Sequence, residues 1–225
     1  MILLRVRHRQ ATGAVPGTLL ILLLAYAQTW VASAAAIPTP MSNAQQSGTA
    51  IVFHAQSHAS EDLWPAVFQA LHADLAEGAG ELPDGLVLDK DPTLVRRNDD
   101  LRGITFSKVI SVKLLGRCDV LAQTEGSFSR GPLSWVMRVS GKVQPFVSID
   151  CTRLAQVLRP KTASLNKEGR RYAMAQAIAH VLIHEWIHIA TQSSAHSARG
   201  VTQAYLSVDQ LIASPKGSHL SSSNR

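Results

Sequence analysis

Four histidines and one glutamate lie close together in the stretch AHVLIHEWIHIATQSSAH, residues 179–196. His184 and His188 are four positions apart, so on a helix they project from one face about one turn apart. Two imidazoles at that spacing can bind one zinc ion (Zn²⁺) at a Zn–N distance of about 2.0–2.1 Å. Glu185 lies beside the same face. The pattern is H-E-x-x-H, which predicts two metal ligands and a carboxylate that acts as a general base.

The chemistry of such a site is hydrolysis. A zinc ion lowers the pKa of a bound water toward about 7, and Glu185 would take its proton as a carbonyl is attacked. An apolar, helix-compatible run from Tyr172 to Val181 leads into the motif. This context favours a metal site over the alternative, a histidine-rich helix packed by hydrogen bonds.

A catalytic zinc needs a third protein ligand, and the candidates are His196, Asp209 and His219. No glutamate follows Glu185, which argues against the class whose third ligand is a glutamate on a later helix. His196 follows a polar run that can end the helix and return the chain. Asp209 opens a short helical pattern and suits capping or surface exposure, and His219 lies in a predicted disordered tail. We predict His196 as the third ligand, with Asp209 as the alternative.

The stretch HEWIHIATQSSAH resembles the zincin metallopeptidases, and among them the metzincins, whose motif is H-E-x-x-H-x-x-G-x-x-H. His184, Glu185 and His188 match in register, and His196 matches in kind. The resemblance implies an exported zinc-dependent peptidase with a zincin-like fold. Its metal ligands would be His184, His188 and His196, and Glu185 would be its catalytic base.

The chain also departs from the metzincin pattern. The last two histidines are eight positions apart instead of six, and Thr191 stands in place of the glycine. No methionine follows Met174, and residues 200–202 occupy the place of the metzincin methionine turn. Tyr205 could donate to an oxyanion, but packing is the favoured role. These departures motivate an alternative function, a non-catalytic extracytoplasmic zinc-binding or protein-binding domain with the same fold. A plain secreted domain without metal is the third possibility.

The elements that must position these residues follow from hydrophobic periodicity and turn signals. We expect helices that begin near residues 60–62, over 152–158, and from 169 past His188, and strands over 49–54, 85–88, 108–115, 133–139 and 143–149. The last two strands form a hairpin, and residues 90–103 form a loop. This order predicts an α+β fold with α/β-like layers, a mixed twisted sheet packed on helices. The strand at 133–139 is a candidate edge for pairing with an extended peptide substrate.

Other residues near the motif have simpler expected roles. His180 is predicted to be a packed histidine with satisfied hydrogen bonds. Trp186 and Ile187 are predicted to face away from the metal and to fix the helix against the sheet. His54 and His58 are expected at the surface.

The N-terminal residues 1–34 predict a signal peptide. Arg5, Arg7 and Arg9 precede an apolar run, and Ala32-Ser33-Ala34 forms a small-residue cleavage site. The alternative is an uncleaved anchor, although the apolar run is short for a bilayer. Cleavage predicts an extracytoplasmic protein, secreted or periplasmic, with no stable membrane span. Residues 35–48 are then a flexible linker, 49–213 the folded domain and 214–225 a disordered tail.

Composition is consistent with one globular domain, since 46% of residues are hydrophobic and 17% are charged. The basic residues are scattered without interleaved aromatics, which argues against nucleic-acid binding. A peptide or protein is the substrate that the resemblance to zincins implies. Cys118 and Cys151 are the only cysteines. In an oxidising compartment they predict one disulfide, with two separate buried thiols as the alternative.

Overall fold

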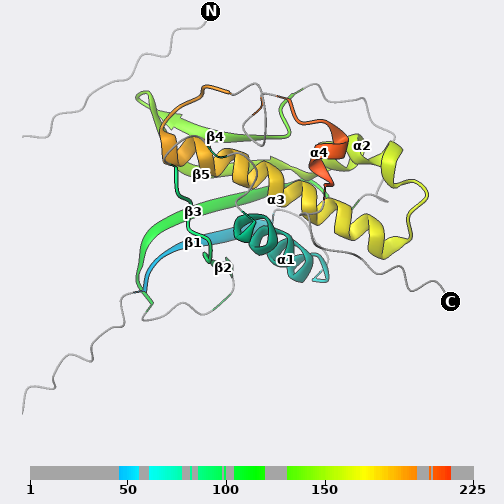
Figure 1. Cartoon of the computed structure of the whole chain (residues 1–225), viewed down its shortest axis with the longest axis horizontal. Coiled ribbons are helices and arrows are strands. Elements are labelled where there is room, and N and C mark those ends of the chain that lie inside the picture. Colours follow the sequence, from blue (N-terminus) through cyan, green and yellow to red (C-terminus); the bar gives the residue numbers. More distant parts are fainter. Residues whose placement is uncertain are drawn as a thin grey trace, which may run out of the picture. The chain divides into compact units, whose positions relative to one another are not determined.

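The structure, a computed structural model of the chain, describes residues 46–55, 61–77, 82, 86–97, 99, 104–119, 131–196, 203 and 205–213. The chain divides into two units, Met1–Met41 and Ser42–Arg225, and every described residue belongs to the second. Figure 1 shows the elements, which in chain order are β1 (Gln46–Ala55), α1 (Leu63–Ala76), β2 (Thr93–Arg96), β3 (Phe106–Leu115), β4 (Ser134–Val139), β5 (Lys142–Asp150), α2 (Cys151–Thr162), α3 (Lys167–Thr191) and α4 (Val208–Leu211).

The five strands form one mixed sheet in the order β2-β1-β3-β5-β4. The first four of these strands run parallel, and β4 runs antiparallel to β5. The predicted hairpin is confirmed: Ser140 and Gly141 form its turn with φ angles of 49° and 79°. Turns with two positive φ angles match the twist of the flanking strands. The α+β fold is therefore as expected, and β4 forms one edge of the sheet.

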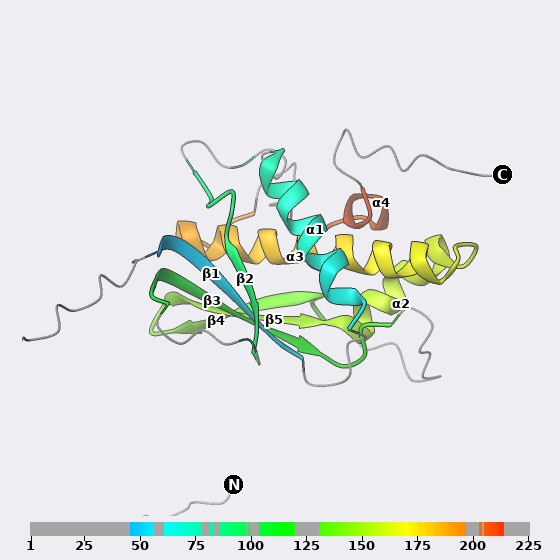
Figure 2. The same cartoon turned by 90° about the horizontal axis from the view of Figure 1, so that it is seen from below.

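Helices α1 and α3 lie together on one face of the sheet (Figure 2). Strand pairing places Phe53 of β1, Val112 of β3 and Val147 of β5 in one row beneath them, and all three are buried. The ring of Phe53 also packs on Trp64 and Phe68 of α1, with centroids 5.6 and 5.7 Å apart. We call this the helix face of the sheet, and the opposite side the open face.

Helix α3 is buried on nearly all sides over its middle turns, as expected of a helix whose residues are apolar all round. It begins two residues before the predicted start, because Asn166 caps it by accepting a hydrogen bond from the Gly169 amide at 2.7 Å. Trp186 and Ile187 are buried in the core, as predicted. The helix that carries the H-E-x-x-H motif is thus held firmly by packing.

The second predicted strand, over residues 85–88, is wrong. Residues 86–89 form no strand, although Leu88 is buried, and β2 lies instead inside the segment predicted as a loop. The run Thr93–Arg96 pairs in parallel with β1, with Leu94 opposite Ile51. Pro92 comes just before the strand, where its missing amide proton is tolerated.

Two predicted boundaries also differ. Helix α2 continues to Thr162 with Pro160 inside it, so the predicted stop before the proline is wrong. Proline removes one backbone hydrogen bond near the helix end, and the Thr162 hydroxyl donates to the Leu158 carbonyl at 3.0 Å. Strand β1 begins at Gln46, so the predicted linker extends three residues too far.

The predicted signal peptide and C-terminal tail, like His58, lie outside the described residues. None of the described helices has the length and apolarity needed to cross a membrane.

The predicted disulfide is present between Cys118 and Cys151. It joins the segment after β3 to the first residue of α2. Gly116 makes this approach possible, because it has a φ of 70° and a side chain there would come within 2.1 Å of the Thr152 hydroxyl.

Candidate metal centre

His184 and His188 face each other on successive turns of α3, with their Nε2 atoms 3.1 Å apart. Two nitrogen ligands of one tetrahedral zinc ion lie about 3.3 Å apart, given Zn–N distances of about 2.0–2.1 Å. The observed separation therefore matches the spacing that a shared ion requires.

The hydrogen bond on the other side of the His188 ring determines its tautomer. Its Nδ1 lies 2.7 Å from the Ser193 carbonyl oxygen. A carbonyl can only accept, so Nδ1 carries the proton and the Nε2 lone pair is directed toward His184. Metal-binding histidines are commonly oriented in this way by a partner on the second nitrogen.

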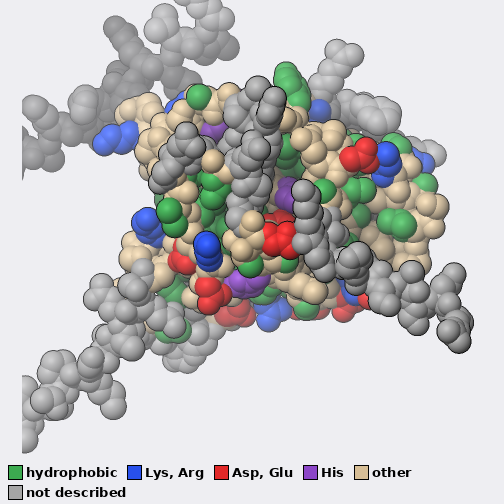
Figure 3. Space-filling model, in the orientation of Figure 1, with side chains coloured by type: hydrophobic (Ala, Val, Ile, Leu, Met, Phe, Trp, Pro, Cys, Tyr) green, Lys and Arg blue, Asp and Glu red, His purple; other side chains and the backbone are tan. Residues whose placement is uncertain are grey.

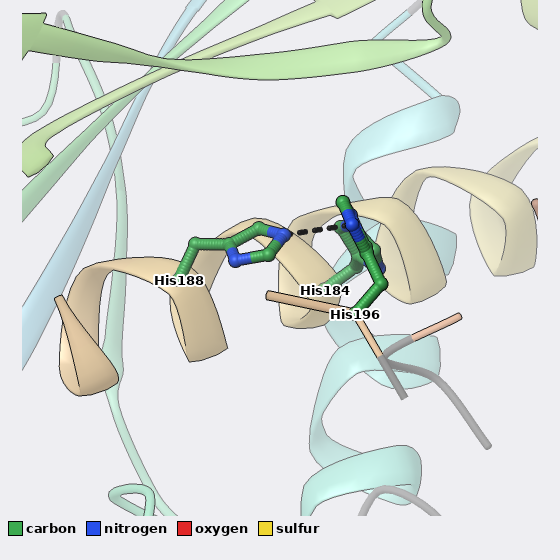
Figure 4. Close-up of side chains that lie close together, drawn as sticks. All are labelled: His184, His188 and His196. Carbon is green, nitrogen blue, oxygen red and sulfur yellow. Dashed lines mark hydrogen bonds between the residues drawn. The ribbon is translucent and has the colours of Figure 1, made fainter. Parts of the chain in front are cut away.

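His196 completes the cluster from the segment after α3 (Figure 4). Its ring stacks near His184 with centroids 5.3 Å apart and lies 4.9 Å from the ring of His188. One nitrogen from each of the three histidines lies within 4.8 Å of the other two. The three histidines could therefore hold one metal ion, and the preference for His196 over Asp209 agrees with this arrangement.

At the end of α3, the residue that turns the chain back is Gln192 and not a glycine. Gln192 is left-handed, with a φ of 54°, and its side chain bonds both the amide and the carbonyl of Val143 at 3.1 Å. These bonds tie the end of α3 to β5. This anchored, left-handed helix end precedes the segment that brings His196 back to the cluster, and it needs no glycine.

Glu185 lies beside the cluster and is only 4% exposed. The hydroxyl of Ser134, on β4, donates to its Oε1 at 2.7 Å. Burial raises the pKa of the Glu185 carboxyl above its ordinary value, while the Ser134 hydrogen bond and the electrostatic effect of His188 oppose that rise. Burial and the electrostatic effect of His188 lower the pKa of His196, which favours the neutral imidazole that a metal needs.

The cluster opens into a cleft of about 840 Å³ between α3, the segment after it and β4. On β4, Ser134, Trp135, Val136 and Arg138 line the cleft. Ser134, Val136 and Arg138 lie opposite the β5 residues Ile149, Val147 and Val143. Those three β5 residues are buried on the helix face, so their three β4 partners share that face. Figure 3 shows histidine side chains at the surface on the side of the molecule that α3 occupies.

The other candidate residues lie elsewhere or have other partners. Asp209 pairs with Lys161 at 2.9 Å, and His219 lies outside the described residues. His180 is a packed histidine, as predicted, with Nδ1 2.9 Å from the Leu211 carbonyl and Nε2 3.3 Å from Asp74. Tyr205 lines the cleft and is 89% exposed, so its predicted packing role is wrong.

Sequence reasoning missed Ser134, Gln192 and Arg138. The alternation of the hairpin strand placed Ser134 and Arg138 on one face, which was the available signal for both. The sequence gives no signal for the role of Gln192, because glutamine rarely adopts a left-handed conformation.

Comparison of the chain with protein-family models, curated proteins and solved structures finds no match.

Proposed function

We propose that this protein is an exported zinc-dependent peptidase. The observation that carries the proposal is the position of a buried carboxylate, Glu185, beside three converging histidines in an open cleft. A binding site alone needs the histidines, whereas a hydrolase also needs a base at that position.

The donor set suits zinc. His184, His188 and His196 are three neutral nitrogen ligands, the number found in catalytic sites that keep a fourth position open. His196 comes from a separate segment, so the three donors are not confined to one helix. When bound, zinc would polarise a substrate carbonyl and lower the pKa of a water molecule.

Glu185 is the general base in this proposal. It would accept a proton from the attacking water and pass it to the amine nitrogen as the peptide bond breaks. Ser134 would hold one carboxylate oxygen and thereby orient the other. A burial-raised pKa makes the carboxylate a stronger proton acceptor than an exposed glutamate.

An extended peptide is the substrate that fits the cleft wall. β4 is the outer strand of the sheet, and its side chains line the cleft. An edge strand can pair through its backbone with an added strand. Such pairing would place a peptide bond beside the contact between Ser134 and Glu185.

Action outside the cytoplasm is part of the proposal. The basic, apolar and small-residue order of residues 1–34 supports it. The Cys118–Cys151 disulfide is a second, independent support, because disulfides persist mainly in oxidising compartments.

The test has a metal arm and an activity arm. Elemental analysis of the purified protein should find about one zinc per chain. His188→Ala should lose the metal, and His72→Ala should keep it, because His72 lies on α1 beside Asp91. A protein without metal would overturn the proposal.

The activity arm compares the natural chain with Glu185→Gln on a mixed peptide library read by mass spectrometry. Loss of the base should lower cleavage by about 10²- to 10⁴-fold while zinc is retained. Equal cleavage by both proteins would leave a non-catalytic zinc-binding or protein-binding domain as the function.

A further inference from the structure

The charges that line the cleft are unequal. Its described lining includes two arginines, Arg138 and Arg153, and a single carboxylate, Glu185. That carboxylate is buried and accepts a hydrogen bond from Ser134, so it offers little charge to a ligand in the open part of the cleft. A bound metal ion would add further positive charge. The described lining therefore carries more positive than negative charge.

Arg138 is well placed to contact a ligand. It lies on the cleft side of β4, four residues after Ser134, and its side chain is exposed. None of the ion pairs between described residues involves Arg138. Its planar guanidinium can bind a carboxylate through two parallel hydrogen bonds.

Arg153 lies toward the other end of the same wall. It belongs to the first turn of α2, where its amide donates to Asp150 at 3.0 Å. Its Nη1 lies beside Gly131, 3.7 Å from where a Cβ would stand. Gly131 precedes Ser134 by three residues, so positive charge flanks the Ser134–Glu185 contact on both sides.

We propose that the cleft selects peptides with acidic side chains, and that Arg138 is the main specificity-determining residue. The inference rests on the proposed function for its peptide substrate. Strands rise about 3.3 Å per residue, so Arg138 lies about 13 Å along β4 from Ser134. A peptide paired with β4 would place an acidic side chain against Arg138 about four residues from the bond that is cleaved.

The first test measures binding without turnover. Glu185→Gln protein is titrated into fluorescent decapeptides that differ only in Glu, Gln or Lys at the flanking positions, and anisotropy is recorded. We expect the Glu peptide to bind roughly fivefold more tightly than the Gln peptide at low salt. The difference should shrink at about 1 M salt, where the Debye length is about 3 Å.

Charge reversal then assigns the selectivity to Arg138. In the Glu185→Gln background, Arg138→Glu should make the Lys peptide the preferred ligand, and Arg138→Gln should abolish the preference. Lys142→Glu is the matched control, because it makes the same charge change in the same hairpin but Lys142 does not line the cleft. Thermal unfolding shows whether each variant is folded.

The outcomes separate this inference from the proposed function. Equal binding of the Glu and Gln peptides, absence of binding, or unchanged selectivity in Arg138→Gln would overturn the inference. Cleavage that depends on Glu185 but ignores acidic residues would overturn it while supporting the peptidase. Selective binding that Arg138→Glu reverses, without cleavage by the natural chain, would support acidic recognition and sink the peptidase.

Discussion

Replacement of Ser134 by alanine tests whether the sheet edge positions the base. The substitution removes the hydroxyl that donates to the Glu185 Oε1 at 2.7 Å and leaves the strand otherwise unchanged. Glu185 belongs to α3 and Ser134 to β4, so the hydrogen bond joins the two walls of the cleft. Without it, the buried carboxylate can rotate away from the productive orientation.

The expected size of the effect follows from the nature of the bond. A hydrogen bond to a charged group contributes about 1.5–3 kcal/mol, and about 1.4 kcal/mol corresponds to tenfold in rate. Ser134→Ala should therefore lower kcat by about 10- to 100-fold. Zinc content and KM should change little, because Ser134 bonds to the base and none of the three histidines.

The pH profile provides a second readout. The Ser134 hydrogen bond lowers the pKa of Glu185, so its loss should raise that pKa. The base works when ionised, and the acid limb of kcat/KM should therefore move to higher pH in Ser134→Ala.

Two variants make the Ser134 result interpretable. Ser134→Thr keeps a hydroxyl and should recover most of the rate. Ser148→Ala is the matched control, because Ser148 lies opposite Trp135 on the open face of the sheet. Steady-state kinetics of Ser134→Ala within twofold of the natural chain, with an unshifted acid limb, would refute this account of Ser134.

Three further perturbations test the supports of the site. Gln192→Ala removes the bonds to Val143 and forces alanine into a left-handed conformation. Zinc affinity, measured by competition with a chelator, should therefore fall by about 10-fold or more, whereas the control Gln144→Ala, next to Val143 on β5, should not lower it. Loss of both cysteines, Cys118→Ser with Cys151→Ser, should destabilise the fold by about 2–4 kcal/mol in urea unfolding, and an unchanged midpoint would contradict a structural role for the disulfide. Burial raises the pKa of Asp74 from 3.8 to about 6, against the attraction of His180. Because the folded protein favours the protonated carboxyl, this group's contribution to the free energy of unfolding is fully present below about pH 4. The contribution is lost as pH rises through about 6. The loss amounts to about 2–3 kcal/mol. Asp74→Asn cannot ionise and should show a smaller decline in unfolding free energy over that window, and curves of equal slope would exclude the carboxyl as the cause.

The parts of the fold that depend on local pattern could be predicted from the sequence. The spacing of Leu63, Val67, Leu71 and Leu75 predicted α1, and all four are buried. The glycine turn predicted the β4–β5 hairpin. These signals lie within a few residues of the elements that they specify.

The parts of the fold that depend on distant contacts could not be predicted from the sequence. β2 is a short run between charged residues, and only its parallel pairing with β1 makes it a strand. Pro160 stops a helix by its local chemistry, yet α2 passes it because side-chain bonding and core packing hold the last turn. In both places tertiary structure overrides a local preference.

The same division applies to the candidate site. The motif predicted His184, Glu185 and His188 because a helix brings residues four apart together. The proximity of His196 to that pair depends on Gln192, whose side chain bonds a strand 49 residues away. Ser134 contacts Glu185 across 51 residues, and only the hairpin register places it there.

These long-range contacts converge on one element. Ser134 on β4 donates a hydrogen bond to Glu185, the proposed base, and the Val143 backbone on β5 bonds the Gln192 side chain, after which the chain returns toward His196. The β4–β5 hairpin therefore supports both the proposed proton acceptor and the third histidine, and it carries Arg138 as well. Because its turn contains two positive φ angles, Gly141→Val should strain the hairpin. That strain should weaken zinc binding and proton transfer together, although residue 141 lines no part of the cleft. A loss of one without the other would mean that the hairpin does not couple the two.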